Sequence, residues 1–273
     1  MRADLYLYQN GHTDSREQAR RLIEAGAVRL DGTPVKKPSL AVDETAEHTV
    51  EIVLPAAERY VGRGGLKLER ALAYFAVDPS RMIALDIGAS TGGFTDCLLQ
   101  NGAARVYAVD SGEGQLHPRL RADDRVVNIE KCNARAMTPD TVGETVDLAV
   151  MDVSFISQTC ILPVLPPLLR EQGMLISLIK PQFEAGRSAV GKGGIVRRRE
   201  HREAAIRRVL ESAAAVGLVC VGLTVSPITG GDGNIEYLAL FCRAAAAGSR
   251  RTVGDGEIRA MTEITKIGGE GDR

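Results

Sequence analysis

Tryptophan is absent from the chain, and aromatic residues make up only 4% of its 273 residues. Proteins that read single-stranded nucleic acids by base stacking need aromatic platforms, so this composition does not favour that mode of binding. The chain also lacks an excess of either charge, because its formal net charge at pH 7 is −1. Any binding of nucleic acid must therefore come from a local arrangement of basic side chains.

Motifs for metals, disulfides and membranes are missing as well. The five cysteines include no C-x-x-C pair and the four histidines show no ligand spacing, so we expect no metal site. An odd number of cysteines without a secretory signal is typical of reduced thiols in the cytosol. The apolar run at residues 161–169 is broken by three prolines and is far shorter than the roughly 20 residues that span a bilayer. We therefore expect a cytoplasmic protein without a membrane partner.

The pattern of apolar residues along the chain predicts two domains joined by a short connector. We expect a small α/β domain at residues 1–58 and a connector rich in glycine and arginine at 59–65. A larger domain of alternating strands and helices should follow at 66–243. Residues 244–273 have little apolar periodicity, so they are predicted to form a flexible tail.

The first domain carries local signals for a helix and a hairpin. Ser15 can cap a helix, with Gln18 three residues further on as its partner. The helix should bury the apolar residues that recur at helical spacing, which are Ala19, Leu22 and Ile23. The Asp-Gly pair at residues 31 and 32 suits a tight turn between two apolar runs, and residues 48–54 should form a further strand.

The same segment resembles the RNA-binding fold named after ribosomal protein S4. The resemblance is carried by Arg2, Asp4 and the stretch SREQARRLIEAGAVRLDGTPVKKPSLAV at residues 15–42. In that family, RNA contacts the face around the second helix and the following hairpin. Alternatively, these basic residues are solvated charges, since Arg20 and Glu24 lie one helical turn apart and can pair. The RNA-binding residues that the resemblance implies are Arg2, Arg16, Arg20, Lys36 and Lys37.

A glycine-rich turn in the second domain predicts a cofactor site. The stretch MIALDIGASTGGFTD (82–96) reads as a buried parallel strand that ends at Asp86, followed by a turn into a helix. Glycines let the backbone approach a ligand closely, and a helix N-terminus offers free N–H groups. Dinucleotide enzymes need G-x-G-x-x-G, which is not present, and an acid before the turn would repel a pyrophosphate. The same acid suits a cationic cofactor such as S-adenosylmethionine.

Two further segments support this site. The strand at 104–110 ends in Asp110, where a carboxylate can accept hydrogen bonds from ribose hydroxyls. Residues 128–135 should bring Asn133 and Ala134 near an adenine ring. The predicted S-adenosylmethionine site consists of Asp86, Gly88, Ala89, Ser90, Gly92, Gly93, Phe94, Asp110, Asn133, Ala134 and Asp152.

Four ionisable residues lie where strand ends and a helix start predict a cleft. Asp152 follows one apolar strand and Lys180 ends the next, so both should reach the same edge of a parallel sheet. Lys67 lies at the start of the first helix of the domain, and Glu236 lies in the final strand. A buried glutamate without a partner is costly, so we expect Glu236 to pair with a lysine.

At this point the resemblance becomes close. The chain resembles the TlyA family of rRNA 2′-O-methyltransferases, whose catalytic domain is FtsJ-like, over about residues 2–242. It implies an α/β, Rossmann-like, doubly wound and mostly parallel seven-stranded sheet with an antiparallel last strand. It also implies ribosomal RNA as the partner, cytidine as the target, and a catalytic tetrad of Lys67, Asp152, Lys180 and Glu236. The motifs that carry it are LDIGASTGGFTD (85–96), MDVSFIS (151–157), LIKPQFEAGR (178–187), VGKGGIV (190–196) and SPITGGDGNIEYL (226–238).

The reaction explains why such residues are needed. A ribose 2′-hydroxyl is a poor nucleophile and must lose its proton during attack on a methyl group. Lys180 is the candidate base, and a lysine amine accepts a proton only when neutral, a form favoured by burial or a second cation such as Lys67. Asp152 and Glu236 would orient the two amines, and alignment of the reacting atoms would supply much of the acceleration.

Basic residues outside the first domain complete the predicted RNA contacts. Arg187 and Lys192 lie in a glycine-rich stretch at 184–200 that can form a mobile loop over RNA phosphates, and Arg63 can contact RNA or couple the domains. From Arg202 onward, the start of a solvated helix explains the charges equally well. The competing functions are a non-catalytic RNA-binding factor, a cytolysin and a nucleotide-dependent oxidoreductase.

Overall fold

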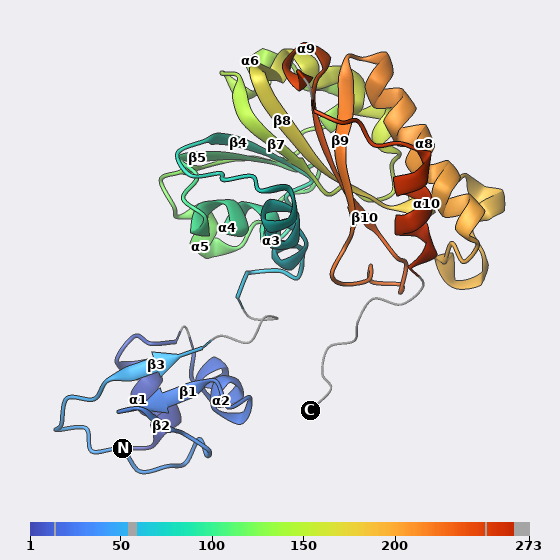
Figure 1. Ribbon diagram of the computed structural model, residues 1–273. Helices are drawn as coiled ribbons and strands as arrows, with labels where there is room; N and C mark the ends of the chain where they lie inside the picture. The colour runs from blue at the N-terminus through green and yellow to red at the C-terminus, as the bar shows by residue number, and fades with distance from the viewer. Residues whose placement is uncertain (14, 54–58, 249, 265–273) are drawn as a thin grey trace. The chain divides into compact units, whose positions relative to one another are not determined.

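The computed structural model (Figure 1) describes residues 1–13, 15–53, 59–248 and 250–264. The chain forms two compact units, residues 1–59 and 60–273. None of the helices in these described ranges is long and apolar enough to cross a membrane. The elements of the first unit are α1 (Ala3–Gln9), α2 (Arg16–Glu24), β1 (Val28–Leu30), β2 (Thr33–Pro34) and β3 (Val50–Ile52).

The first unit packs its two helices on a three-stranded antiparallel sheet in the order β2-β1-β3. The predicted cap is confirmed, because the Ser15 hydroxyl accepts a hydrogen bond of 3.1 Å from the backbone N–H of Gln18. The predicted hairpin is also confirmed, with φ of 50° at Asp31 and 73° at Gly32, as a primed turn requires. The predicted strand at 48–54 spans Val50–Ile52, and residues 54–58 lie outside the described ranges. The core of this unit includes all three predicted residues, Ala19, Leu22 and Ile23.

The second unit is built on one seven-stranded sheet in the order β6-β5-β4-β7-β8-β10-β9. Its strands are β4 (Ile83–Ile87), β5 (Arg105–Val109), β6 (Val126–Ile129), β7 (Val146–Met151), β8 (Leu169–Ile179), β9 (Leu218–Val225) and β10 (Tyr237–Arg243). Its α-helices are α3 (Gly64–Phe75), α4 (Gly93–Gln100), α5 (Pro118–Arg121), α6 (Pro139–Val142), α7 (Pro181–Glu184), α8 (Arg199–Ala215), α9 (Ala244–Ala247) and α10 (Asp255–Glu263). Short 3-10 helices lie at η2 (Ala134–Ala136), η3 (Gln158–Cys160), η4 (Leu162–Val164), η5 (Pro166–Leu168), η6 (Arg187–Ala189) and η7 (Lys192–Gly194).

The strand directions confirm the predicted doubly wound architecture. Strands β4, β5, β6, β7 and β8 are parallel to one another, whereas β10 runs antiparallel to both β8 and β9. Helices α3, α4 and α5 cover one face of the sheet, and α8 and α10 cover the other (Figure 1). Both faces are buried, which explains the nearly continuous apolar sequence of the central strands. The carboxyl ends of β4, β5, β7 and β8 therefore meet at one edge.

The segment after β10 corrects the prediction of a flexible tail. Helix α10 buries Ile258 and Thr262, which lie four residues apart and so share one face of the helix. The guanidinium of Arg202 donates hydrogen bonds to the carbonyl of Thr262 and to the hydroxyl of Tyr237, at 2.8 and 3.1 Å. A single apolar residue per turn is too weak a sequence pattern to predict such a helix. Residues 265–273 lie outside the described ranges.

The predicted connector at 59–65 packs largely with the second unit. Tyr60 is buried in the core cluster that contains α3 and α4, and α3 begins at Gly64. A Cβ atom at Gly65 would collide with the ring of Tyr60, so glycine is required there for this packing. The second unit thus begins several residues earlier than the alternation of strands and helices indicates.

Candidate active site

The glycine-rich turn after β4 brings the backbone close to the end of β7. Gly88 has φ of 84°, and a Cβ atom there would lie 2.6 Å from the carbonyl oxygen of Asp152. At Gly92, with φ of 98°, a Cβ atom would collide with the side chains of Leu116 and Leu120. Glycine is therefore needed at these two positions both for the left-handed backbone and for the close approach.

A cavity of about 410 Å³ opens at this edge of the sheet. Gly92, Gly93 and Phe94 do not line the cavity, nor do Asp86 and Ala89, so these five predicted residues shape its surroundings. The lining residues that the prediction missed include Ser111, Gln115, Ser154 and Phe155. The predicted cofactor residues that line it are Gly88, Ser90, Asp110, Asn133, Ala134 and Asp152.

The two predicted acids of the cofactor strands have different environments. Asp86 is fully buried, and its carboxylate accepts a hydrogen bond of 2.7 Å from the hydroxyl of Thr95. Burial raises the pKa of Asp86 to about 7. Asp110 lies at the cavity and accepts hydrogen bonds from the backbone N–H groups of Ser90 and Gly112, at 2.8 and 2.7 Å. Asp86 therefore lies beneath the turn, and Asp110 shapes the turn from the cavity side.

The four predicted catalytic residues form two ion pairs. Lys180 Nζ lies 2.6 Å from Asp152 Oδ1, and Lys67 Nζ lies 2.6 Å from Glu236 Oε2. The register of the sheet explains the proximity of Lys180 and Glu236, because Ile179 at the end of β8 pairs with Tyr237 at the start of β10. Glu236 itself lies one residue before β10 and is buried, and its pairing with Lys67 matches the expected lysine partner.

The loop after β7 adds two residues to this group. The Lys180 amine donates a hydrogen bond of 2.8 Å to the hydroxyl of Ser154. Phe155 has φ of 63° and is 93% exposed, with its ring centroid 5.3 Å from that of Phe183. Both rings and Arg187 line a second hollow of about 460 Å³. An exposed phenylalanine beside a buried ion pair has little packing to gain there, so the ring is available for contact with a substrate.

A buried carboxylate anchors this loop. Glu184 on α7 is 1% exposed and accepts hydrogen bonds from the hydroxyl of Ser157 at 2.5 Å and from the backbone N–H of Gln158 at 2.8 Å. The Gln158 side chain in turn donates to the carbonyl of Leu178 and accepts from the hydroxyl of Ser177. The pKa of Glu184 is raised by its burial. Ser157 and Glu184 belong to two of the motifs that carry the family resemblance, but nothing in the sequence predicted that they meet.

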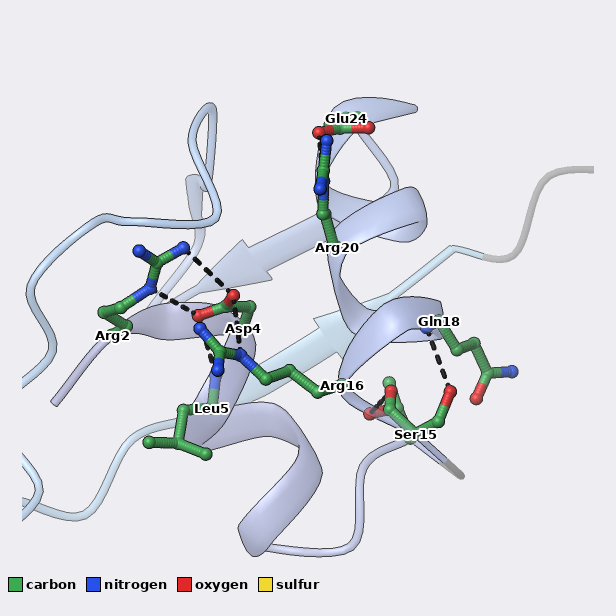
Figure 2. Close-up of polar contacts among 9 residues, drawn as sticks. Arg2, Asp4, Leu5, Ser15, Arg16, Gln18, Arg20 and Glu24 are labelled. Atoms are coloured by element: carbon green, nitrogen blue, oxygen red, sulfur yellow. Dashed lines mark hydrogen bonds and ion pairs between the residues drawn. The ribbon is translucent and has the colours of Figure 1, made fainter.

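The predicted RNA-binding residues are exposed in both units. In the first unit, Arg2 and Arg16 both bond to Asp4, and Arg20 pairs with Glu24 at 2.8 Å (Figure 2). The remaining predicted residues are Lys36, Lys37, Arg63, Arg187 and Lys192, all on the surface of their own unit.

Arg202 differs from both interpretations of its stretch, because it belongs neither to a solvated face nor to a loop. It is buried and bonds α8 to β10 and α10. In the described ranges, no three His, Cys, Asp or Glu side chains form a group that could hold a metal ion.

The family profile for FtsJ-like methyltransferases matches residues 60–243, which contain the cavity and both ion pairs. The chain belongs to the FtsJ-like methyltransferase family. The profile for the S4 domain matches residues 1–48 of the same methyltransferase. The resemblance of the first unit to the S4 fold is thereby confirmed.

Several known proteins resemble this methyltransferase over nearly its whole length. 16S/23S rRNA (cytidine-2′-O)-methyltransferase TlyA of Mycobacterium tuberculosis is 43% identical over 263 residues, which is 96% of this chain and 97% of that protein. Hemolysin A of Brachyspira hyodysenteriae is 43% identical over 242 residues, 88% of this chain and 99% of that protein. A solved structure from Streptococcus thermophilus, whose name carries the word hemolysin, is 43% identical, covers 96% of this chain and 94% of its own, and has a TM-score of 0.71.

The cofactor of this family, S-adenosylmethionine, fits the residues at the cavity. The volume of about 410 Å³ is within the range of small-molecule sites. Carboxylates of Asp110 and Asp152 lie in its wall, and a negatively charged wall suits a cofactor that carries a positive charge and ribose hydroxyls. Gly88 keeps one wall free of a side chain that would fill the turn.

Proposed function

We propose that this methyltransferase transfers a methyl group to the ribose 2′-hydroxyl of a cytidine in 16S rRNA, 23S rRNA or both. The observation that carries the proposal is the two lysine–carboxylate ion pairs at this edge of the sheet, Lys180 with Asp152 of the cavity wall and Lys67 with the buried Glu236. The Mycobacterium tuberculosis relative is named for this reaction, and its similarity extends over both units. Ribosomes would then be the partner and the cytoplasm the place of action.

Lys180 is the proposed base. When bound, S-adenosylmethionine supplies an electrophilic methyl group, and the 2′-hydroxyl must give up its proton as it attacks. The Lys180 amine is tethered on one side by Asp152 and on another by Ser154, so its position is restricted by two bonds from the loop after β7. In its neutral form this amine would take the hydroxyl proton, and the charge that forms would be stabilised by the Asp152 carboxylate.

Lys67 and Glu236 would contribute to the same site. Lys67 would supply a second positive charge, and Glu236 would hold its amine in place. The Lys67 amine lies in the first turns of α3, and Glu236 fixes it there at 2.6 Å. Lys67 would act through its charge on the reacting groups, with Glu236 orienting its amine. The near absence of solvent around Lys67 and Glu236 strengthens this electrostatic effect.

The proposed cofactor contacts divide into two groups. Those at the cavity wall are Gly88, Ser90, Asp110, Asn133, Ala134 and Asp152. Asp86, Ala89, Gly92, Gly93 and Phe94 would act through the shape of the turn. The first unit, together with Arg63, Arg187 and Lys192, would hold the RNA.

Transfer of tritium from labelled S-adenosylmethionine to ribosomal subunits that lack the modification tests the function. We expect label in an alkali-resistant 2′-O-methylated dinucleotide with the natural chain and none with Lys180→Ala.

The outcomes of this assay separate the alternatives. Full transfer by Lys180→Ala would exclude that residue as the base. No label in either subunit, with cofactor binding intact, would show that the RNA substrate is a different one. If the natural chain neither transfers label nor binds the cofactor, the result would favour a non-catalytic RNA-binding factor.

A further inference from the structure

A buried carboxylate lies between two predicted RNA-binding arginines of the first unit. Asp4 is 2% exposed, although it is surrounded by the side chains of Arg2 and Arg16, which are each 50% exposed (Figure 2). We propose that Asp4 is a positioning residue that holds the guanidinium groups of Arg2 and Arg16 as a preformed clamp for an RNA phosphate. This inference rests on the proposed RNA substrate and assigns a role to a residue that would not itself touch RNA.

The hydrogen bonds define how the two guanidinium groups are held. Arg2 donates from Nε to Asp4 Oδ1 at 3.0 Å and from Nη2 to Asp4 Oδ2 at 3.1 Å. Arg16 donates from Nε to the same Oδ2 atom at 3.0 Å. Arg2 directly precedes α1, whereas Arg16 is the first residue of α2, so only the fold brings the two arginines to one carboxylate. A planar guanidinium that is fixed along one edge keeps a defined orientation.

The bonds to Asp4 leave donors on both arginines for a ligand. A guanidinium has five N–H donors, of which Arg2 uses two and Arg16 uses one in these contacts. Both side chains line an open hollow of about 470 Å³ together with Pro38 and Ser39. Paired guanidinium groups with free N–H edges match the oxygens of a phosphate group, which accept several short charge-assisted bonds.

Asp4 remains charged and in place under physiological conditions. Burial opposes its charged form, but the hydrogen bonds from Arg2 and Arg16 together hold the pKa of Asp4 below its ordinary value of 3.8. Asp4 also accepts a bond of 3.0 Å from the backbone N–H of Leu5, and its own N–H donates to the carbonyl of Pro38 at 3.1 Å. The clamp is thus attached to the backbone of α1 and of the segment that lines the hollow.

Glu24 provides a matched control on the same face. It pairs with Arg20 at 2.8 Å, but both partners are more than half exposed, which makes this a surface pair of little energetic weight. Glu24 and Glu17 also line the hollow. Removal of any acid from this face reduces the repulsion of RNA by the same charge. Simple electrostatics therefore predicts that Asp4→Asn and Glu24→Gln both bind RNA as well as, or better than, the natural chain.

The positioning role predicts the opposite sign for Asp4. The experiment measures binding of the full chain and of both variants to ribosomal subunits that lack the modification, over a range of salt concentrations. We expect about tenfold weaker binding for Asp4→Asn and a smaller slope of log K against log salt by about 1, since a phosphate contact is lost. Glu24→Gln should bind at least as tightly as the natural chain. Unchanged or tighter binding by Asp4→Asn would overturn the inference.

A merely structural role is tested by a second pair of measurements. In the background of Arg2→Ala with Arg16→Ala, Asp4→Asn should cause no further loss of RNA binding, whereas general damage to the unit would still lower it. If Asp4→Asn fails to fold, Arg16→Lys keeps the charge and the contact with Asp4 but lacks the second edge of the guanidinium. We expect about fivefold weaker binding for Arg16→Lys, and full binding by this variant would overturn the inference.

Methyl transfer separates this inference from the proposed function. With Asp4→Asn, KM for the subunits should rise while kcat and the affinity for S-adenosylmethionine stay unchanged. Failure of the natural chain to bind or methylate the subunits would instead refute the proposed substrate. If the natural chain methylates them and Asp4→Asn does so with the same KM, only the clamp is refuted.

Discussion

Two lysines with carboxylate partners dominate the site at the scale of single residues. The Lys67–Glu236 pair is nearly closed to solvent, whereas Asp152, the partner of Lys180, lines the cavity. Ion pairs withdrawn from water gain little net stability, because removal of both charges from water is costly. The ion pairs serve mainly to hold the lysine amines in place, since an amine with a fixed carboxylate partner has few alternative positions. A lysine is also the only cation that can lose its proton here, because arginine keeps its proton in proteins.

This difference leads to the first prediction, for Lys180→Arg. Arginine retains the positive charge and can still pair with Asp152, but it cannot accept a proton from the ribose hydroxyl. If Lys180 is the base, we expect kcat to fall by about 100-fold or more in Lys180→Arg, as in Lys180→Ala. Single-turnover methyl transfer to ribosomal subunits measures this loss, and S-adenosylmethionine affinity serves as the control. Near-normal turnover by Lys180→Arg would mean that the residue acts through its charge alone.

The second prediction concerns the pH dependence caused by Asp86. Burial raises the pKa of this carboxyl from its ordinary 3.8 to about 7, so the folded chain keeps a proton that the unfolded chain releases between these values. The free energy of unfolding should therefore fall as the pH rises from about 4 to about 7, by about 1 kcal/mol per pH unit in that window. Above about pH 7, where both states have lost the proton, this contribution no longer changes.

Asp86→Asn isolates this effect, because asparagine has nearly the same shape and does not titrate. Urea unfolding at pH 5.5, 6.5 and 7.5 should show a smaller pH dependence for the variant than for the natural chain. The pKa of His48 is raised from its ordinary 6.5, chiefly by the hydrogen bond to Asp31, but this residue is present in both proteins and contributes equally to both curves. Parallel curves for the two proteins would contradict a raised pKa for Asp86.

At the scale of elements, the loop after β7 depends on a helix that follows β8. Glu184 on α7 holds Ser157 and the backbone of Gln158, and the same loop carries Ser154, which accepts a hydrogen bond from Lys180. Ser154 and Phe155, which line the cavity, therefore lie on a loop that is held by a carboxylate outside its wall. Side-chain hydrogen bonds of Glu184 thus join the segments that follow β7 and β8, in addition to the backbone hydrogen bonds between the two strands.

Glu184→Ala is the third prediction. The substitution leaves the buried N–H of Gln158 and the hydroxyl of Ser157 without their acceptor, which should lower the free energy of unfolding by about 1–3 kcal/mol. We also expect a lower kcat, because the loop is less well held. Urea unfolding and methyl transfer provide the two readouts. Glu211→Ala, an exposed change on α8, should alter stability by no more than about 0.5 kcal/mol, and an equal effect of both changes would refute the anchor.

The whole molecule consists of two units with separate hydrophobic cores. The core of the first unit contains Leu7, Leu22 and Val28, whereas the cavity and both ion pairs belong to the second. A unit of about 60 residues has a small core and correspondingly little stability to lose. The two units should therefore respond independently to a change in the core of one of them.

Leu22→Ala gives the fourth prediction. Loss of this buried side chain should cost about 2–5 kcal/mol, enough to unfold a marginally stable first unit at physiological temperature. Binding to ribosomal subunits should fall strongly, while S-adenosylmethionine binding, measured by calorimetry, stays within about twofold. A parallel loss of cofactor binding would show that the two units do not fold independently.

Much of the architecture could be read from local patterns. The cap at Ser15, the turn at Asp31 and Gly32, and the apolar strands of the large sheet each depend on neighbours in the sequence, so the prediction was confirmed. The pairing of Lys67 with Glu236 also agrees with the sequence, because a buried glutamate without a cationic partner is costly. Helix α10 was missed because its two buried residues form too weak a pattern.

The sequence by itself determined the order of the elements and the residue types at the strand ends, since backbone propensity, turn chemistry and apolar periodicity act over a few residues. Only the tertiary structure decided which distant side chains meet. The convergence of Arg2 and Arg16 on Asp4, the anchoring of Ser157 by Glu184 and the burial of Arg202 join segments far apart in the chain. Such contacts follow from packing, where burial forces each polar group to find a partner wherever the fold places one.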